Sequence, residues 1–156
     1  MNRAGPGYHD LREGAEIAPR QYQVTRRDLV RYAGASGDFN VIHWNERIAK
    51  SVGLPDVIAH GMLTMALAGR FLTEWAGDPG AVTEFGVRFS APVVVPDDDK
   101  GAQVEMSGVV TGKLDGNRVT VDVTARSGEA KVLTRARAVV RLRAVPAQGD
   151  DPLEPR

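Results

Sequence analysis

Hydrophobic positions recur with two different periods, one in each half of the chain. In residues 61–76 (GMLTMALAGRFLTEWA) most positions are apolar, which is typical of a helix that other elements cover on several sides. Gly77 and Pro79 follow and favour an end to the helix there. The sequence therefore predicts one long buried helix, with Met62 and Met65 in its core and few solvent-facing positions, chiefly Thr64, Arg70, Thr73 and Glu74.

Four segments after this helix alternate apolar and polar residues with a period of two, namely 84–90, 103–107, 119–126 and 135–142. Such alternation predicts strands with one covered face and one face in water, hence an antiparallel sheet. Turn-forming residues, DGN at 115–117 and SGE at 127–129, lie where tight hairpins are required. A polar loop at 96–99 separates the first two of these strands.

The first half of the chain adds a strand and a helix. Residues 17–24 alternate loosely, which predicts a strand. Thr25, with Asp28 three residues later, predicts a capped helix start, and this helix is expected to end near Gly34 or Gly37. The whole pattern predicts an α+β fold in which a curved antiparallel sheet wraps around one long central helix.

Composition limits the classes of protein that the chain can belong to. Its 156 residues fit one domain, placed at 9–145, after a flexible N-terminal arm at 1–8 and before a disordered tail at 146–156. Twenty basic and twenty acidic residues cancel, so no excess of charge favours nucleic acid or a membrane surface. The absence of cysteine excludes disulfides and thiolate chemistry. With no signal-like or membrane-spanning apolar run, the protein is expected in the cytoplasm.

The residues that could carry chemistry gather in one stretch, residues 36–65. Asp38 lies five residues before His43, and His60 with Gly61 opens the long apolar segment. Five residues correspond to about 500° of helical rotation, which leaves two side chains about 140° apart. Asp38 and His43 can therefore converge only if the backbone between them is irregular, which the turn-forming residues there favour. A short helix is expected next, at 45–52.

Two motifs in this stretch resemble those of a known family. The run Asp38-Phe39-Asn40-Val41-Ile42-His43, followed by Ala59-His60-Gly61-Met62-Leu63, resembles the signature of MaoC-like (R)-specific enoyl hydratases and (3R)-hydroxyacyl dehydratases. The usual pattern there is Asp-x-Asn-Pro-x-His, then an HGM-type start of the central helix. Within the family, residues 14–142 most resemble the catalytic B subunit of mycobacterial-type (3R)-hydroxyacyl-ACP dehydratases, through the stretches TRRDLV, IAHGMLTM and GDPGAVTE.

The resemblance implies the hot-dog fold and the reversible hydration of 2-enoyl thioesters to (3R)-3-hydroxyacyl thioesters, without a cofactor. It implies Asp38 and His43 as the pair that handles protons, and neutral imidazole is indeed a base near pH 7. The backbone N–H of Gly61 would polarise the thioester oxygen at the positive end of the helix dipole. Asn40, Ser36 and His60 would support these groups. The chain departs from the family at Val41, which replaces a common proline, and this change is expected to loosen the loop.

Other functions and sites remain open at this point. A hot-dog thioesterase would share the fold and the oxygen donor without needing the Asp–His pair, and an acyl-binding subunit of a heterodimeric dehydratase would lack the pair. Since one such domain leaves sheet edges open, a homodimer or a heterodimer with a second hot-dog subunit is expected, with acyl-CoA or acyl-carrier-protein (ACP) substrates.

Several polar residues have a simpler interpretation. His9 lies next to the arm and is considered incidental. Two histidines and one aspartate at these spacings match no standard metal-ligand set, so no metal site is expected. Four arginines lie on the predicted strands, and we expect them to form a face exposed to water. A less favoured interpretation is that some of them contact the phosphate of a carrier protein. The four are Arg88, Arg135, Arg137 and Arg141.

Overall fold

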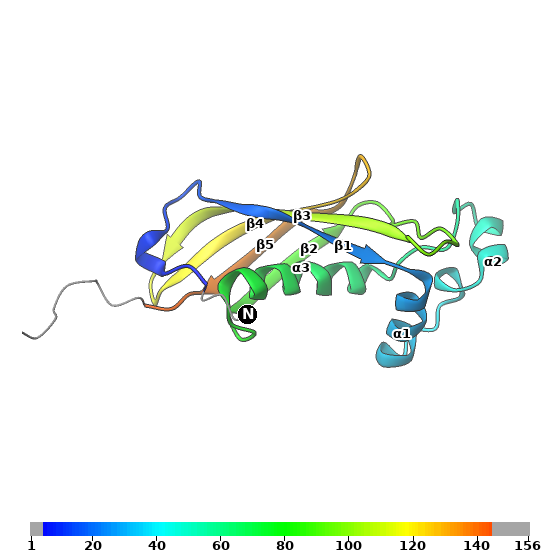
Figure 1. Ribbon diagram of the computed structural model, residues 1–156, viewed down its shortest axis with the longest axis horizontal. Helices are drawn as coiled ribbons and strands as arrows, with labels where there is room; N and C mark the ends of the chain where they lie inside the picture. The colour runs from blue at the N-terminus through cyan, green and yellow to red at the C-terminus, as the bar shows by residue number, and fades with distance from the viewer. Residues whose placement is uncertain (1–4, 145–156) are drawn as a thin grey trace, which may run out of the picture.

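Five strands and one long helix form the body of the protein in a computed structural model, which describes residues 5–144 (Figure 1). The elements in chain order are the 3-10 helix η1 (Tyr8–Asp10), β1 (Glu16–Val24), α1 (Arg26–Ser36), the 3-10 helix η2 (Val41–His43), α2 (Glu46–Ser51), α3 (Gly61–Ala76), β2 (Val82–Phe89), β3 (Ala102–Leu114), β4 (Arg118–Ser127) and β5 (Ala130–Arg141). The predicted α+β architecture and the four strands after the long helix are confirmed.

The strands form one antiparallel sheet in the order β1-β3-β4-β5-β2. The two predicted hairpin turns join β3 to β4 and β4 to β5, and their Gly116, Asn117 and Gly128 have positive φ angles of 73°, 57° and 57°. In β5 an extra residue bulges out beside Arg135, whose φ is 48°, so the strand changes register against both of its neighbours. β1 and β2 are left as the edges of the sheet.

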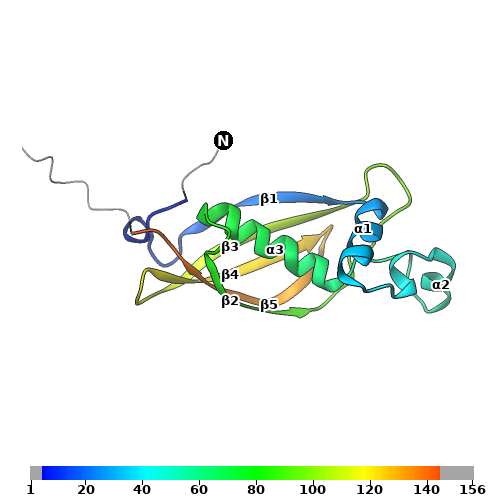
Figure 2. The same cartoon turned by 90° about the horizontal axis from the view of Figure 1, so that it is seen from below.

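The helix α3 lies along one face of the sheet, as the two views show (Figures 1 and 2). Ala68, Phe71 and Leu72 on this helix are completely buried and belong to the core. Phe71 packs at Gly108 of β3, where a Cβ atom would come within 3.4 Å of its ring. The lack of a side chain at Gly108 therefore lets the helix approach the sheet closely.

The sheet covers only one side of α3 in this chain, which corrects two sequence predictions. Thr64, expected to face solvent, is buried with 4% exposure, while Met62, expected in the core, is 54% exposed. Because apolar residues occur around most of the helix, the sequence does not show which face packs against the sheet, and it could not distinguish these two positions. The predicted bounds at Gly61 and Ala76 are confirmed, and Gly77 ends the helix with a φ of 69°.

The helices α1 and α2 lie beyond one end of the sheet, and η1 lies at the opposite end (Figure 1). The predicted cap is confirmed: Thr25 and Asp28 form a capping box, in which the Thr25 N–H donates to the Asp28 carboxylate over 2.8 Å. Of the two predicted helix ends the second is correct, because Gly37 adopts the left-handed conformation with a φ of 76°. The short helix α2 falls within the predicted 45–52, with Asn45 as its N-cap.

The described part of the chain begins at Gly5, inside the arm predicted at 1–8. Gly7 forms a bridge with Arg143, and the Tyr8 hydroxyl donates to the Leu114 carbonyl over 3.0 Å. These residues therefore contact the end of the sheet, whereas the arm before Gly5 and the tail predicted at 146–156 lie outside the described residues. Within residues 5–144 no helix is long and apolar enough to cross a membrane.

Candidate active site

The loop after α1 is shaped by side chains that bind its own backbone. The Ser36 hydroxyl accepts a hydrogen bond from the Asp38 N–H over 3.2 Å, and the Asp38 carboxylate accepts one from the Asn40 N–H over 3.2 Å. The Asn40 side chain in turn accepts from the Ile42 N–H over 3.3 Å and caps η2. These turns replace the helical path and bring Asp38 and His43 to one place. The irregular backbone predicted for this segment is therefore present.

His43 is buried, with 7% exposure, at the end of η2. Its Nδ1 lies 2.7 Å from the carbonyl oxygen of Ile58. Because a carbonyl can only accept a hydrogen bond, Nδ1 carries the proton in the neutral ring and Nε2 keeps a free lone pair. Burial lowers the pKa of His43 below 6.5, and the hydrogen bond to Ile58 opposes this shift. Two weaker effects come from neighbouring charges: His60 lowers the pKa and Asp38 raises it. His43 is thus a neutral base near pH 7.

His60 is the N-cap residue of α3 and is almost completely buried, with 1% exposure. Its Nε2 donates to the backbone carbonyl of Asp38 over 3.0 Å, and its ring stacks on His43 with centroids 3.7 Å apart. Tyr32 of α1 covers the ring at 4.8 Å. Nδ1 of His60 is buried without a hydrogen-bond partner among the described residues. His60 therefore connects the start of α3 to the loop that carries Asp38.

Asp38, His43 and His60 form a compact polar cluster, in which one potential ligand atom of each lies within 4.8 Å of the others. The two imidazole planes are only 25° from parallel. Lone pairs of imidazole nitrogens lie in the ring plane, so two stacked rings do not direct them to one ion as a tetrahedral site requires. The exposed carboxylate of Asp38 beside a neutral imidazole suits proton transfer better.

The helix α3 starts at this cluster with a free amide group. His60 gives the helix no side-chain cap, and the Gly61 N–H has no acceptor among residues 5–144. A Cβ at Gly61 would come 3.2 Å from two ring carbons of Phe89, the last residue of β2. Because Gly61 has no side chain, nothing on its Cα obstructs access to the N–H group. This group lies at the N-terminal end of the helix, which favours negative charge.

A cavity of about 380 Å³ opens at this point between α3 and the sheet. His43, Gly61 and Thr64 line one part of it, and Phe89, Ser90 and Val132 line another. The buried Thr64, whose hydroxyl lies 3.5 Å from the His60 carbonyl, is the residue that sequence reasoning missed. The signal available in the sequence was the position of Thr64, a hydroxyl-bearing residue one turn after Gly61 in an otherwise apolar part of the helix.

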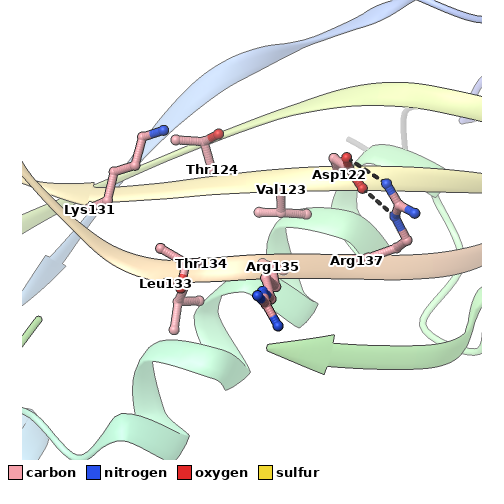
Figure 3. A pocket seen from close by; sticks show the side chains of 9 residues that line it. Asp122, Val123, Thr124, Lys131, Leu133, Thr134, Arg135 and Arg137 are labelled. Atoms are coloured by element: carbon pink, nitrogen blue, oxygen red, sulfur yellow. Dashed lines mark hydrogen bonds and ion pairs between the residues drawn. The ribbon is translucent and has the colours of Figure 1, made fainter. Parts of the chain in front are cut away.

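A larger groove of about 560 Å³ lies over β4 and β5 and contains none of the predicted site residues (Figure 3). Arg137 there donates two hydrogen bonds to Asp122, of 2.6 and 2.9 Å. Arg135 lies on the same surface. The predicted solvated face of arginines is confirmed, because all four are exposed. Contact of this face with a carrier-protein phosphate stays a prediction.

The predicted site residues therefore fall into two groups, and His9, considered incidental, lies away from both. Asp38, His43 and His60 converge, and Gly61 lies on the cavity beside them. Ser36 and Asn40 act on the backbone of the loop. His9 lies apart in η1, where it packs edge-on against Tyr8.

Known proteins resemble this chain over most of its length. Residues 12–131 match the family model described as MaoC like domain. An (R)-specific enoyl-CoA hydratase of Rhodospirillum rubrum is 32% identical over 143 residues, which are 91% of this chain and 93% of the relative. The 3-hydroxyacyl-thioester dehydratase X of Mycobacterium tuberculosis is 43% identical over 74 residues, 47% of this chain and 25% of that protein.

Solved structures resemble this chain as well. A MaoC-like dehydratase superposes with a TM-score of 0.85 at 44% identity, over 91% of this chain and 44% of the other. The ChsH1-ChsH2 complex of M. tuberculosis contains a chain with a TM-score of 0.73 at 26% identity, over 84% of this chain and 98% of that one. The predicted hot-dog fold is confirmed by neighbours of this kind. The chain thus spans nearly all of some relatives but only a quarter to a half of others.

Proposed function

Because the chain belongs to the MaoC-like family, we propose that it interconverts 2-enoyl thioesters and (3R)-3-hydroxyacyl thioesters by adding or removing water. One observation carries the proposal: the carboxylate of Asp38 lies beside the neutral imidazole of His43, and His43 lines one cavity together with Gly61 at the start of α3. These are a base, a second proton carrier and an oxyanion donor, which are the three groups that the reaction needs.

The roles follow from the atoms that remain free. In hydration, Nε2 of His43 takes a proton from water while the water oxygen bonds to C3 of the enoyl group. The electron pair of the double bond moves to the thioester oxygen, which the Gly61 N–H stabilises as an enolate. The proton held by His43 then passes through the Asp38 carboxylate to C2 as the enolate collapses, so that one water is added and both side chains regain their starting protonation. Dehydration runs through the same steps in reverse.

Ser36, Asn40 and His60 support this chemistry without taking part in it. Ser36 and His60 bind the backbone of Asp38, and Asn40 binds the backbone N–H of Ile42, beside His43. We assign them to the support of the Asp38–His43 pair. The thioester carrier is CoA or ACP, since both present the acyl group on the same phosphopantetheine arm.

A second hot-dog subunit completes this proposal. The side of α3 that carries Met62 is open in the single chain, and β2 is an open edge next to the cavity. The ChsH1-ChsH2 neighbour is a complex, and the chain spans only part of several relatives. We infer a partner of the same fold, either a second copy or a different chain, with this chain as the member that carries the Asp–His pair.

The test is the loss of enoyl-thioester absorbance with crotonyl-CoA, in the wild type and in Asp38→Asn and His43→Gln. Both substitutions are expected to reduce kcat/KM by at least about a hundredfold while the fold stays intact. Asp10→Asn and His9→Gln are matched controls, because both side chains lie in η1. Equal rates in all variants would contradict the assignment. Release of free thiol would indicate a thioesterase, and turnover only after a partner is added would indicate a heterodimer.

A further inference from the structure

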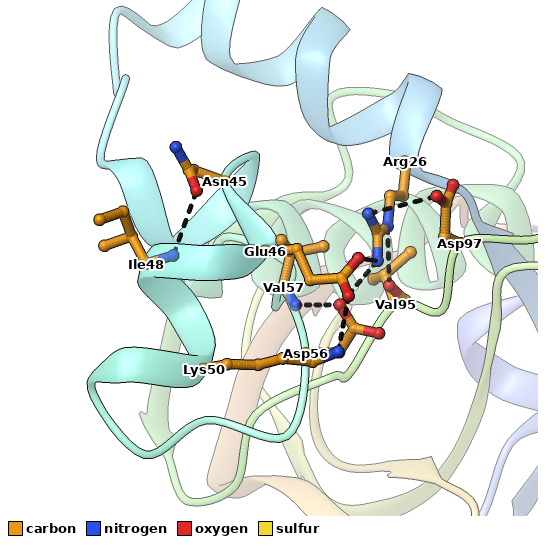
Figure 4. A network of polar contacts seen from close by, with 9 residues as sticks. All are labelled: Arg26, Asn45, Glu46, Ile48, Lys50, Asp56, Val57, Val95 and Asp97. Carbon is orange, nitrogen blue, oxygen red and sulfur yellow. Dashed lines mark hydrogen bonds and ion pairs between the residues drawn. The ribbon is translucent and has the colours of Figure 1, made fainter.

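Arg26, the first residue of α1, joins four segments that are distant in the sequence (Figure 4). Resting on the proposed function, we propose that Arg26 is a positioning residue, which sets the orientation of the His43 imidazole through residues 56–58. Arg26 itself does not line the cavity at Gly61. Its effect on the reaction is therefore indirect, by way of the backbone carbonyl that holds His43.

The guanidinium of Arg26 is surrounded by acceptors. Its Nη2 donates to the Asp56 carboxylate over 2.6 Å and to the Glu46 carboxylate over 2.9 Å. Its Nε donates to the Val95 carbonyl over 3.3 Å, and the Asp97 carboxylate lies 3.8 Å from Nη1. The Arg26 side chain is 23% exposed and that of Asp56 is 21% exposed, so water screens this pair only in part.

Hydrogen bonds and the peptide link from Val57 to Ile58 together lead from this guanidinium to the imidazole. The carboxylate oxygen of Asp56 that Arg26 holds also accepts from the Val57 N–H over 2.7 Å. The Val57 carbonyl accepts from the Val95 N–H over 2.9 Å. Ile58 follows, and its carbonyl is the acceptor for Nδ1 of His43 over 2.7 Å.

Arg26 thus holds both sides of the short bridge that fixes the Ile58 carbonyl. It binds Asp56 on one side and Val95 on the other, and Ile58 pairs with Val94 between them. The Ile58 N–H also donates to Ile42, the neighbour of His43. A shift of Asp56 would consequently move the groups that fix both the backbone and the ring of His43.

Charge explains why this position needs a cation. Three carboxylates, Glu46, Asp56 and Asp97, face one guanidinium, and Lys50 shares only Glu46. Without Arg26 the carboxylates of Glu46 and Asp56 would repel each other while partly shielded from water. Lysine keeps the charge but cannot form the forked contacts, so Arg26→Lys is expected to restore the arrangement only in part.

The experiment compares Arg26→Gln and Arg26→Lys with Arg31→Gln. Arg31 is a matched control on the same helix, because it is 72% exposed and its one ion pair among residues 5–144 is with Asp28, at 3.9 Å. We expect kcat/KM for crotonyl-CoA to fall at least about tenfold in Arg26→Gln, less in Arg26→Lys, and not in Arg31→Gln. The loss is expected in kcat rather than in KM, since the cavity wall is unchanged.

Nitrogen NMR of the His43 ring above its pKa gives a readout that needs no substrate. The wild type and Arg31→Gln are expected to show the Nδ1–H tautomer, and Arg26→Gln a mixture with the Nε2–H tautomer. An unchanged tautomer, or a folded and fully active Arg26→Gln, would overturn the proposal. Global unfolding of both Arg26 variants would also overturn it, in favour of a purely structural role. If the wild type hydrates no thioester but the tautomer still shifts, the proposed function fails while the placement of His43 by Arg26 stands.

Discussion

His43 and His60 stack face to face with ring centroids 3.7 Å apart, and each ring is anchored to a different carbonyl. His43 binds Ile58 through Nδ1, whereas His60 binds Asp38 through Nε2. The two rings therefore leave opposite nitrogens without a carbonyl partner within residues 5–144, Nε2 in His43 and Nδ1 in His60, and of the two residues His43 lines the cavity. Because two stacked imidazolium ions would repel each other, the pair favours the neutral form of His43.

The first prediction concerns the pH dependence of the proposed hydration. Burial lowers the pKa of His43 below 6.5, so the active neutral ring is expected to predominate from about pH 7 upward. kcat/KM should fall as the pH decreases through that lowered pKa, because protonation removes the base. A pH profile with crotonyl-CoA measures this limb. An acid limb centred above 6.5 would contradict the assignment of His43 as the base.

The same group links pH to stability. The folded pKa of His43 is lower than the unfolded one, so the unfolded chain binds more protons in the window between the two values. The free energy of unfolding is therefore expected to decrease as the pH falls from about 6.5 through the folded pKa. Urea titrations over this range, compared with His43→Gln, should show that the substitution removes this part of the pH dependence.

Local signals in the sequence were sufficient for the elements and for part of the site. The capping box at Thr25, the end of α1 at Gly37 and both bounds of α3 depend on neighbouring residues, and the structure confirms them. The hairpin turns depend on glycine in the same way. The confirmed family and fold followed from the two motifs between Asp38 and Leu63, since such motifs carry the spacing of a site in one stretch.

Long-range contacts were outside the reach of the sequence. No periodicity distinguishes the buried Thr64 from the exposed Met62, because the sheet that covers one of them comes later in the chain. The contact of Arg26 with Asp56 and Val95 likewise joins residues 30 and 69 positions apart. The roles of the site residues and the finer resemblance to a B subunit stay predictions.

The second prediction concerns Gly61, whose amide is the proposed oxyanion donor. In Gly61→Ala the new methyl group would lie 3.2 Å from the Phe89 ring and beside the position of the thioester oxygen. We expect kcat/KM to fall at least about tenfold, while the free energy of unfolding changes by no more than about 1 kcal/mol, since Phe89 is half exposed and can move.

Gly69→Ala is the matched control for this substitution. Gly69 lies on the same helix, and a Cβ there would meet nothing within 4 Å. Alanine is expected to stabilise the helix by up to about 1 kcal/mol and to leave turnover unchanged. Thermal unfolding and the absorbance assay measure both effects. Full activity of Gly61→Ala would show that the reaction does not need an unobstructed amide at this position.

The third prediction concerns Val41, which stands where the family commonly has proline. The structure shows a loop that is held without it: the Val41 carbonyl accepts from the Asn45 N–H over 2.8 Å, and the Trp44 indole donates to the Phe39 carbonyl over 3.1 Å. The Val41 N–H has no acceptor among the described residues, and Asn40 before it has a φ of −55° and a ψ of 126°. Both features suit proline.

Val41→Pro is therefore expected to raise the free energy of unfolding by about 0.4–1 kcal/mol, chiefly by restricting the unfolded chain, and to preserve the proposed activity. Val52→Pro is the contrasting control, because the Val52 N–H donates to the Ile48 carbonyl over 3.1 Å and proline would remove that bond. Urea unfolding of the two variants should move in opposite directions. A destabilised Val41→Pro would mean that the loop needs a conformation at residue 41 that proline cannot adopt, and that the family proline was replaced together with a change in the path of the backbone.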